Sequence, residues 1–160
     1  MKCVYVGLGS NEGDRMANLE KAKRLMNGRS IRIIKASPVY QTPAWGDVDQ
    51  PPYLNQVVEV ETDSEPKVLL EKLQQIEQAM GRKGHGWSAP RPIDLDILAC
   101  GDYILDGPDL KIPHPCLVER GFVLVGLSRI APDLVHPVNG MTVSEMLRGV
   151  DCDGIQIYSD

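Results

Sequence analysis

The chain has 160 residues, of which 42% are hydrophobic and 24% are charged, a balance that predicts one domain, residues 1–160, with a substantial core. A net charge of −5 argues against a protein that coats nucleic acid, so any polyanion site must be local. Four scattered cysteines without zinc-type spacing and the absence of a membrane-spanning or export pattern lead us to expect a cytoplasmic protein with reduced thiols.

The first part of the chain has a strand, loop, helix pattern. Apolar residues alternate over residues 4–8, and the strand is expected to end at Gly9-Ser10-Asn11. Asp14 is the expected cap of a helix whose apolar positions recur over residues 16–26. A dinucleotide fingerprint would need a glycine at position 12 rather than at Gly13, and no phosphate-loop lysine follows, so the sequence favours neither motif.

The middle of the chain predicts two strands separated by a long connection. The second strand is expected over residues 31–36, and residues 53–60 are expected to form the next. Residues 40–53 between them combine prolines with aromatic residues, which is typical of an exposed, stiff loop that binds a ligand. Asn55 offers a donor and an acceptor to a heterocycle, or is an ordinary sheet-edge amide bonded to backbone.

A second helix is expected from a Ser64 cap to Gly81, because apolar residues recur there every three to four positions. Gln74 and Glu77 lie near that apolar stripe and could reach a site beyond the end of the helix, but the favoured expectation is that both are solvated. Residues 82–93 then contain four basic side chains and no acidic one, with glycines at the start and prolines at the end. This composition predicts a basic lid over an anion.

Asp94 and Asp96 alternate with the apolar residues of a fourth predicted strand, residues 94–100. Side chains two apart on a strand share a face, with Cα atoms roughly 6.6 Å apart, so these carboxylates repel unless a cation lies between them. Hard divalent ions bound by carboxylates and substrate phosphates are the usual solution. An EF-hand is excluded because Leu98 and Ala99 stand where that loop needs ligands and a glycine.

The remaining residues predict shorter elements. A short helix is expected around Leu117 and Val118, a buried helix over residues 123–127, another over residues 143–147, and a last strand over residues 155–158. His114, between two prolines, either fills a loop or donates to phosphate, and Phe122, the only phenylalanine, is either core or part of a site.

Five islands of sequence resemble one enzyme family: Gly9-Ser10-Asn11, Tyr53-Leu54-Asn55, Pro90-Arg91-x-x-Asp94-Leu95-Asp96-Ile97-Leu98, Pro113-His114 and Arg120-Gly121-Phe122. In this order they are similar to 6-hydroxymethyl-7,8-dihydropterin pyrophosphokinase of folate biosynthesis, over essentially the whole chain. The resemblance implies an α+β, ferredoxin-like sandwich with a mainly antiparallel sheet and packed helices. It also implies a monomer that transfers the pyrophosphoryl group of ATP to the pterin hydroxymethyl group and releases AMP.

The resemblance further implies the residues of the site. Two Mg²⁺ ions would be held by Asp94 and Asp96, and catalytic roles would belong to Arg82, Arg91 and Asp96. ATP would be bound by a wider set: Gln74, Arg82, Lys83, Trp87, Arg91, Ile97, Lys111, His114 and Arg120. The pterin pocket would consist of Thr42, Pro43, Tyr53, Asn55, Trp87 and Phe122. Such transfer depends on placement and charge neutralisation more than on covalent help.

This chain departs from the family pattern in two places. The lid lacks the further arginines that family members often carry, so Lys83 or His85 would replace them with less directional charge. Asp109 and Lys111 stand where an arginine and a threonine are common. Two other classes fit less well: a nucleotidyltransferase has its Gly-Ser pair much closer to the acids, and a non-catalytic ligand sensor has no need for a basic lid.

Overall fold

The computed structural model describes residues 2–43, 50–81 and 91–158. Its first half contains β1 (Lys2–Ser10), α1 (Arg15–Asn27), β2 (Arg32–Ala36), β3 (Tyr40–Thr42), β4 (Tyr53–Thr62) and α2 (Pro66–Ala79). The second half contains β5 (Asp94–Ala99), β6 (Leu105–Asp106), β7 (Lys111–Ile112), α3 (Gly121–Ile130), α4 (Val143–Arg148) and β8 (Gln156–Ile157). The predicted strands 4–8, 53–60 and 94–100 are confirmed as β1, β4 and β5.

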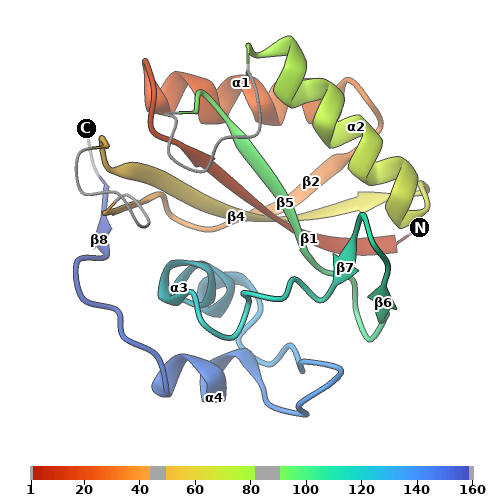
Figure 1. Ribbon diagram of the computed structural model, residues 1–160, viewed down its shortest axis with the longest axis vertical. Coiled ribbons are helices and arrows are strands. Elements are labelled where there is room, and N and C mark those ends of the chain that lie inside the picture. Colours follow the sequence, from red (N-terminus) through yellow and green to blue (C-terminus); the bar gives the residue numbers. More distant parts are fainter. Residues whose placement is uncertain (1, 44–49, 82–90, 159–160) are drawn as a thin grey trace.

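One antiparallel sheet lies at the centre of the molecule (Figure 1). Its strands follow the order β5-β1-β4-β3-β8, and β2 also pairs with β4, while β6 and β7 form a separate small ladder. Helices α1 and α2 cover one face of the sheet and α3 and α4 cover the other (Figure 1). The mixed α+β class with a mainly antiparallel sheet is therefore confirmed.

The two faces of the sheet form separate cores. Residues such as Val6, Leu95 and Ile97 pack with α1 and α2 in one apolar cluster, whereas Val57 and Leu98 pack with α3 and α4 in the other. Because alternate strand residues point to opposite faces, Asp94 and Asp96 project from the α3 side of the sheet. The apolar cluster under α1 and α2 therefore lies on the opposite face of the sheet from the two carboxylates.

Local signals account for most helix boundaries. The side chain of Asp14 accepts a hydrogen bond from Ala17 N and caps α1 as predicted. At α4, Thr142 and Glu145 form a reciprocal capping box, which satisfies two backbone donors of that short helix. Helix α3 lies close to β4 because it has Gly126 at the contact, where a Cβ would lie 2.7 Å from Val57 Cγ2.

Three predictions of local structure were wrong. Helix α2 is capped by Glu65 without a side-chain bond, and Ser64 instead accepts from Lys72 Nζ. Residues 40–42 belong to β3 rather than to an exposed loop, because Tyr40 and Thr42 are buried when β3 pairs with β4 and β8. The short helix expected around Leu117 and Val118 does not form, and residues 115–119 form hydrogen-bonded turns instead.

Candidate active site

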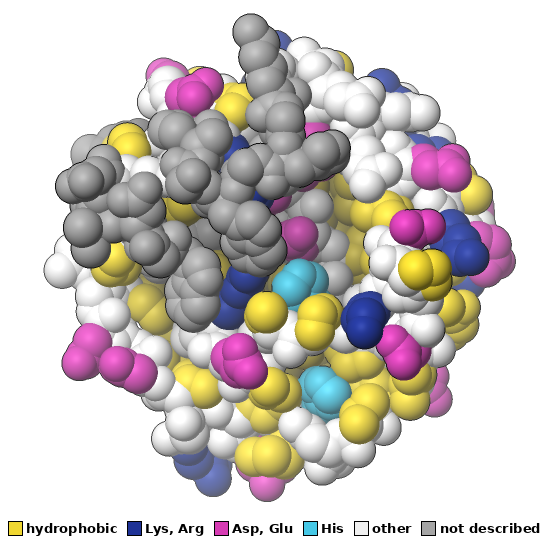
Figure 2. Space-filling view, viewed as in Figure 1, with side chains coloured by type: hydrophobic (Ala, Val, Ile, Leu, Met, Phe, Trp, Pro, Cys, Tyr) yellow, Lys and Arg dark blue, Asp and Glu magenta, His cyan; other side chains and the backbone are white. Residues whose placement is uncertain are grey.

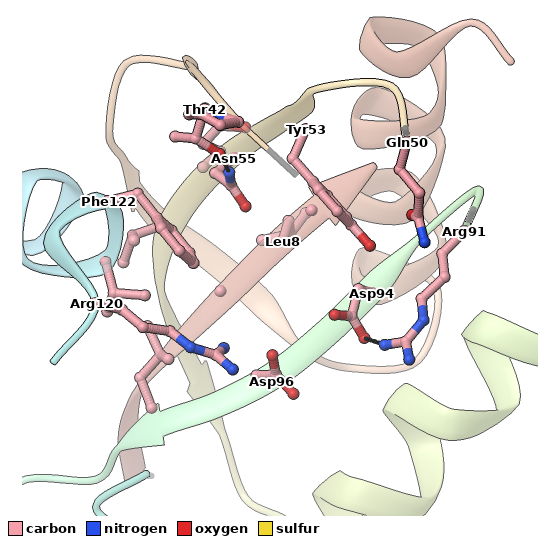
Figure 3. Close-up of a pocket in the computed structure, with 17 residues that line it drawn as sticks. Leu8, Thr42, Gln50, Tyr53, Asn55, Arg91, Asp94, Asp96, Arg120 and Phe122 are labelled. Atoms are coloured by element: carbon pink, nitrogen blue, oxygen red, sulfur yellow. Dashed lines mark hydrogen bonds and ion pairs between the residues drawn. The ribbon is translucent and has the colours of Figure 1, made fainter. Parts of the chain in front are cut away.

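A pocket opens on the α3 side of the sheet, between β1, β4 and β5 and the N-terminal end of α3 (Figure 3). Strand backbone at Gly7, Leu8 and Gly9 forms part of its lining. Figure 2 shows acidic, basic and histidine side chains side by side at a hollow on one face of the molecule. The labelled side chains that surround the pocket in Figure 3 are Thr42, Gln50, Tyr53, Asn55, Arg91, Asp94, Asp96, Arg120 and Phe122.

The carboxylates of Asp94 and Asp96 point from β5 into this pocket (Figure 3). The sharing of one strand face by the two acids is thus confirmed. Arg91 Nη1 lies 3.4 Å from Asp94 Oδ1, and the two side chains are 17% and 24% exposed. This partial burial strengthens their electrostatic interaction with charged ligands relative to a fully solvated pair. One end of the pocket is therefore suited to a polyanion and cations.

The other end of the pocket is formed by aromatic and amide side chains. Tyr53 from β4 and Phe122 from the start of α3 lie on either side of a hollow, with Asn55 between them in Figure 3. Asn55 Nδ2 donates to Thr42 Oγ1 at 2.7 Å, which fixes the orientation of the carboxamide. Its Oδ1 points toward the hollow (Figure 3). The arrangement is suited to a flat heterocycle with polar edges.

Five members of the predicted pterin set lie within the described residues, and all of them line the pocket: Thr42, Pro43, Tyr53, Asn55 and Phe122. The alternative that Phe122 is only core is not supported: it is partly buried, and the guanidinium of Arg120 lies 5.9 Å from its ring centroid. Arg120 also lines the pocket. The sixth member of the set, Trp87, lies outside the described residues, as do Arg82 and Lys83.

His114 is not among the residues that line the pocket, but two residues that do, Asp94 and Arg120, act electrostatically on its imidazole. Its Nδ1 accepts from Cys116 N at 3.1 Å, and its backbone N donates to Leu98 O at 2.8 Å. Burial lowers the pKa of His114 below 6.5, and the positive charge of Arg120 lowers it further, while Asp94 opposes this. A neutral imidazole that accepts at Nδ1 carries its proton on Nε2, so His114 offers a neutral donor to a ligand.

Three other predicted nucleotide contacts are not part of the pocket lining. The Ile97 side chain is buried in the α1 and α2 core and faces away from the pocket, so the predicted contact of Ile97 with ATP would have to come from its backbone. Gln74 is exposed on α2, as its sequence position indicated. Lys111 on β7 is paired with Asp106 Oδ1 at 3.3 Å.

Glu77 was expected to be solvated, and this was wrong. It is 6% exposed, and its Oε2 accepts from the backbone N of Leu95 at 2.9 Å. The carboxylate thus joins α2 to β5 between the two aspartates. The available signal was its position four residues after Leu73 and three before Met80, which places it inside the apolar stripe of the helix.

Gln50 was also missed by the sequence reasoning. It lines the pocket near Arg91 and Tyr53 (Figure 3), and its Oε1 accepts from Asn11 Nδ2 at 3.0 Å. Its position in a proline-rich connection carried no periodic pattern from which its orientation could be inferred. The contact that orients it comes from a residue 39 positions away in the chain.

The donor set at Asp94 and Asp96 fits a hard cation. Both offer carboxylate oxygens, the ligands that Mg²⁺ prefers, and they point into the same pocket (Figure 3). Among residues 2–43, 50–81 and 91–158, no cluster of three or more His, Cys, Asp or Glu side chains is arranged to hold a metal. Two protein carboxylates suit an ion whose remaining ligands come from water and substrate phosphates.

Helices long and apolar enough to cross a membrane are absent from the part of the chain that the structure describes. Comparison with known proteins gives a more specific result. A family model described as 7,8-dihydro-6-hydroxymethylpterin-pyrophosphokinase matches residues 5–132. The chain is 43% identical over 157 residues to the 2-amino-4-hydroxy-6-hydroxymethyldihydropteridine pyrophosphokinase of Methylorubrum extorquens, covering 98% of each chain.

Other relatives extend this similarity. The enzyme of the same name from Aquifex aeolicus is 40% identical over 138 residues, with 86% of each chain covered. The folic acid synthesis protein fol1 of Schizosaccharomyces pombe is 40% identical, but the chain spans only 22% of its length. Among solved structures, a Plasmodium falciparum HPPK-DHPS chain matches with a TM-score of 0.75 at 18% identity, over 92% of this chain and 45% of that one.

Proposed function

Because this chain belongs to the 7,8-dihydro-6-hydroxymethylpterin-pyrophosphokinase family, we propose roles in that reaction for the residues of its pocket. The family is the pyrophosphokinase of folate biosynthesis, an ATP-dependent enzyme that acts on the hydroxymethyl pterin. The proposal assigns the aromatic end of the pocket to the pterin and the acidic end to the triphosphate. We further propose that the protein acts as a cytoplasmic monomer; the sequence composition supports the location, and the family resemblance supports the monomeric state.

The pterin is bound between Tyr53 and Phe122. A flat ring gains from stacking on aromatic faces, with centroids roughly 4.5 to 7 Å apart. Asn55 Oδ1 accepts from the polar edge of the ring, because its Nδ2 is already engaged by Thr42. Thr42 and Pro43 close the same side. This placement leaves the hydroxymethyl group directed toward the acidic end.

The triphosphate is bound at the acidic end. Arg91 and Arg120 line the pocket and neutralise phosphate oxygens, and His114 donates as a neutral imidazole. Asp94 and Asp96 would hold two Mg²⁺ ions, which would supply charge neutralisation of the triphosphate. Arg82 and Lys83 would add positive charge from residues 82–90, which the structure does not describe.

The reaction proceeds by attack of the pterin hydroxyl oxygen on the β-phosphorus of ATP. A new oxygen to phosphorus bond forms, the bond from that phosphorus to the oxygen bridging it to the α-phosphate breaks, and AMP leaves with that oxygen. The hydroxyl proton is released, and Asp96 is the carboxylate we propose to receive it. In-line placement of the reactants together with charge neutralisation contributes most of the acceleration in such transfers.

The observation that carries this proposal is the presence of an aromatic and amide site next to paired carboxylates in one pocket (Figure 3). Phosphorus NMR of a reaction with MgATP and the hydroxymethyl pterin tests it. AMP and a pterin diphosphate are the expected products. Production of ADP would instead indicate a simple kinase, and free pyrophosphate a nucleotidyltransferase, and either result would overturn the proposal.

A further inference from the structure

Asn11 lies directly after β1 and is 1% exposed. Its Nδ2 donates to Gln50 Oε1 at 3.0 Å and to Pro51 O at 3.2 Å. Its Oδ1 accepts from Arg91 N at 2.7 Å, and its own backbone N donates to Arg91 O at 3.0 Å. One buried carboxamide thus joins two segments that lie 39 and 80 residues away in the chain.

The loop that carries Asn11 is itself anchored. Asn18, in the first turn of α1, donates from Nδ2 to Glu12 O at 2.8 Å and to Ser10 Oγ at 3.3 Å. Ser10 is fully buried. Because α1 packs on the sheet through its buried apolar residues, the position of Asn11 is set by the core rather than by the loops that it contacts.

The two joined segments lead to opposite ends of the pocket, one assigned to the pterin and the other to the triphosphate. Gln50 and Pro51 lead directly into Tyr53, on the pterin side, while Arg91 leads into Asp94, on the phosphate side. Gln50 and Arg91 both line the pocket and lie near each other in Figure 3. An asparagine that only stabilised its own loop would bond to backbone groups of one segment. Asn11 instead donates from Nδ2 to one segment and accepts at Oδ1 from another.

We propose that Asn11 is a positioning residue that fixes the pterin-side segment relative to Arg91 and the phosphate site. The inference rests on the proposed function. Its physical basis is the sensitivity of in-line transfer to geometry, in which a misplacement of about 1 Å costs on the order of 100-fold in rate. Asn11 itself touches neither reactant and acts through Gln50, Pro51 and Arg91.

Two variants, which differ in charge, both remove the hydrogen bond from residue 11 to Pro51 O. Asn11→Asp keeps an acceptor for Arg91 N but turns its second oxygen toward Pro51 O, which has no hydrogen to donate. Asn11→Ser is neutral and too short to reach Gln50 and Pro51. We expect kcat to fall by about 10- to 100-fold in both, with dissociation constants for a non-hydrolysable MgATP analogue and for the pterin changed by less than about threefold.

A double-mutant cycle tests whether the effect passes through Gln50. Gln50→Leu removes the acceptor and should lower kcat by itself, and it remains measurable if the Asn11 variants do not fold. Added to Asn11→Ser, it should have little further effect, because groups that share one link are not additive. Cooperative thermal unfolding of each variant is recorded as a control for folding.

The possible results separate the two proposals. A fall in kcat without loss of affinity, shared by Asn11→Asp and Asn11→Ser and non-additive with Gln50→Leu, supports the positioning role. Unchanged kcat, additive losses, or losses wholly in ligand affinity would overturn it while leaving the proposed function intact. If the unmodified protein makes no AMP and pterin diphosphate, the proposed function fails first, and this inference fails with it.

Discussion

Gly9 on β1 faces the Asn55 side chain on β4 so closely that a Cβ at position 9 would lie 3.0 Å from Asn55 Oδ1. The two residues are register partners in the β1 to β4 ladder. The same Cβ would lie 3.4 Å from Tyr53 Cδ1. The absence of a side chain at Gly9 therefore leaves room for the amide and the aromatic ring that we assign to the pterin.

This contact predicts that Gly9→Ala weakens pterin binding by about tenfold or more, because the added methyl group displaces the side chains of Asn55 and Tyr53 from their positions. Gly7→Ala is the matched control: it lies on the same strand and lines the same pocket, but the nearest atoms to its Cβ would be those of the Leu98 side chain, at an ordinary contact distance of 3.5 Å. Calorimetric titration with the pterin compares the two. Equal losses would show that the effect is not specific to Asn55.

The orientation of Asn55 depends on Thr42, which accepts from Asn55 Nδ2 at 2.7 Å. Thr42→Val keeps the shape but removes the acceptor, so we expect a loss in pterin affinity of about 1 kcal/mol. Thr42→Ser keeps the hydroxyl and should bind nearly as well as the unmodified protein. Affinity for a MgATP analogue should be unaffected in both, and a shared loss for both ligands would indicate a packing defect.

Replacing the paired carboxylates should reduce turnover without unfolding the protein. Asp94→Asn and Asp96→Asn each remove a charged oxygen ligand at constant size, and each should lower kcat/KM by roughly 100-fold or more, which corresponds to about 3 kcal/mol. Asp133→Asn, at an exposed position outside the pocket lining, is the control. Parent-like turnover with unaltered Mg²⁺ dependence in either variant would exclude a metal role for that residue.

Glu77 should contribute to stability as well as to the placement of β5. Glu77→Leu leaves the buried N of Leu95 without its acceptor, and we expect a loss of about 1 to 3 kcal/mol in the free energy of unfolding. Glu77→Gln keeps a carbonyl oxygen and should cost less. Urea denaturation monitored by circular dichroism measures both, and equal stability of Glu77→Leu and the parent would refute the structural role.

The lowered pKa of His114 makes stability depend on pH. Between the folded-state pKa and 6.5, the unfolded chain binds more protons at this residue than the folded protein does, so stability rises with pH and is lost as the pH falls below about 6.5. In an NMR titration the His114 signal should have a midpoint below 6.5. His114→Gln should reduce the slope of stability against pH in this range, and a midpoint at or above 6.5 would contradict the assignment.

Features that depend on neighbours in the chain were predictable from the sequence. The alternation around Asp94 and Asp96 placed both acids on one face, since strand geometry alone decides this. The cap at Asp14 and the apolar stripe of α2 likewise reflect contacts within a few residues. The resemblance carried by Tyr53 to Asn55 and Arg120 to Phe122 correctly grouped side chains that the fold brings into one pocket.

Only the tertiary structure decided which polar side chains are buried and what they hold. The position of Glu77 in the apolar stripe of α2 indicated burial, but its hydrogen bond with Leu95 N depends on β5 packing against the helix and not on its own segment. The same holds for Gln50 and Asn11, whose partners lie tens of residues away, and for β3, which forms only because β4 and β8 pair on either side of it. Such contacts gain their energy from groups that are distant in the chain, and no local pattern encodes them.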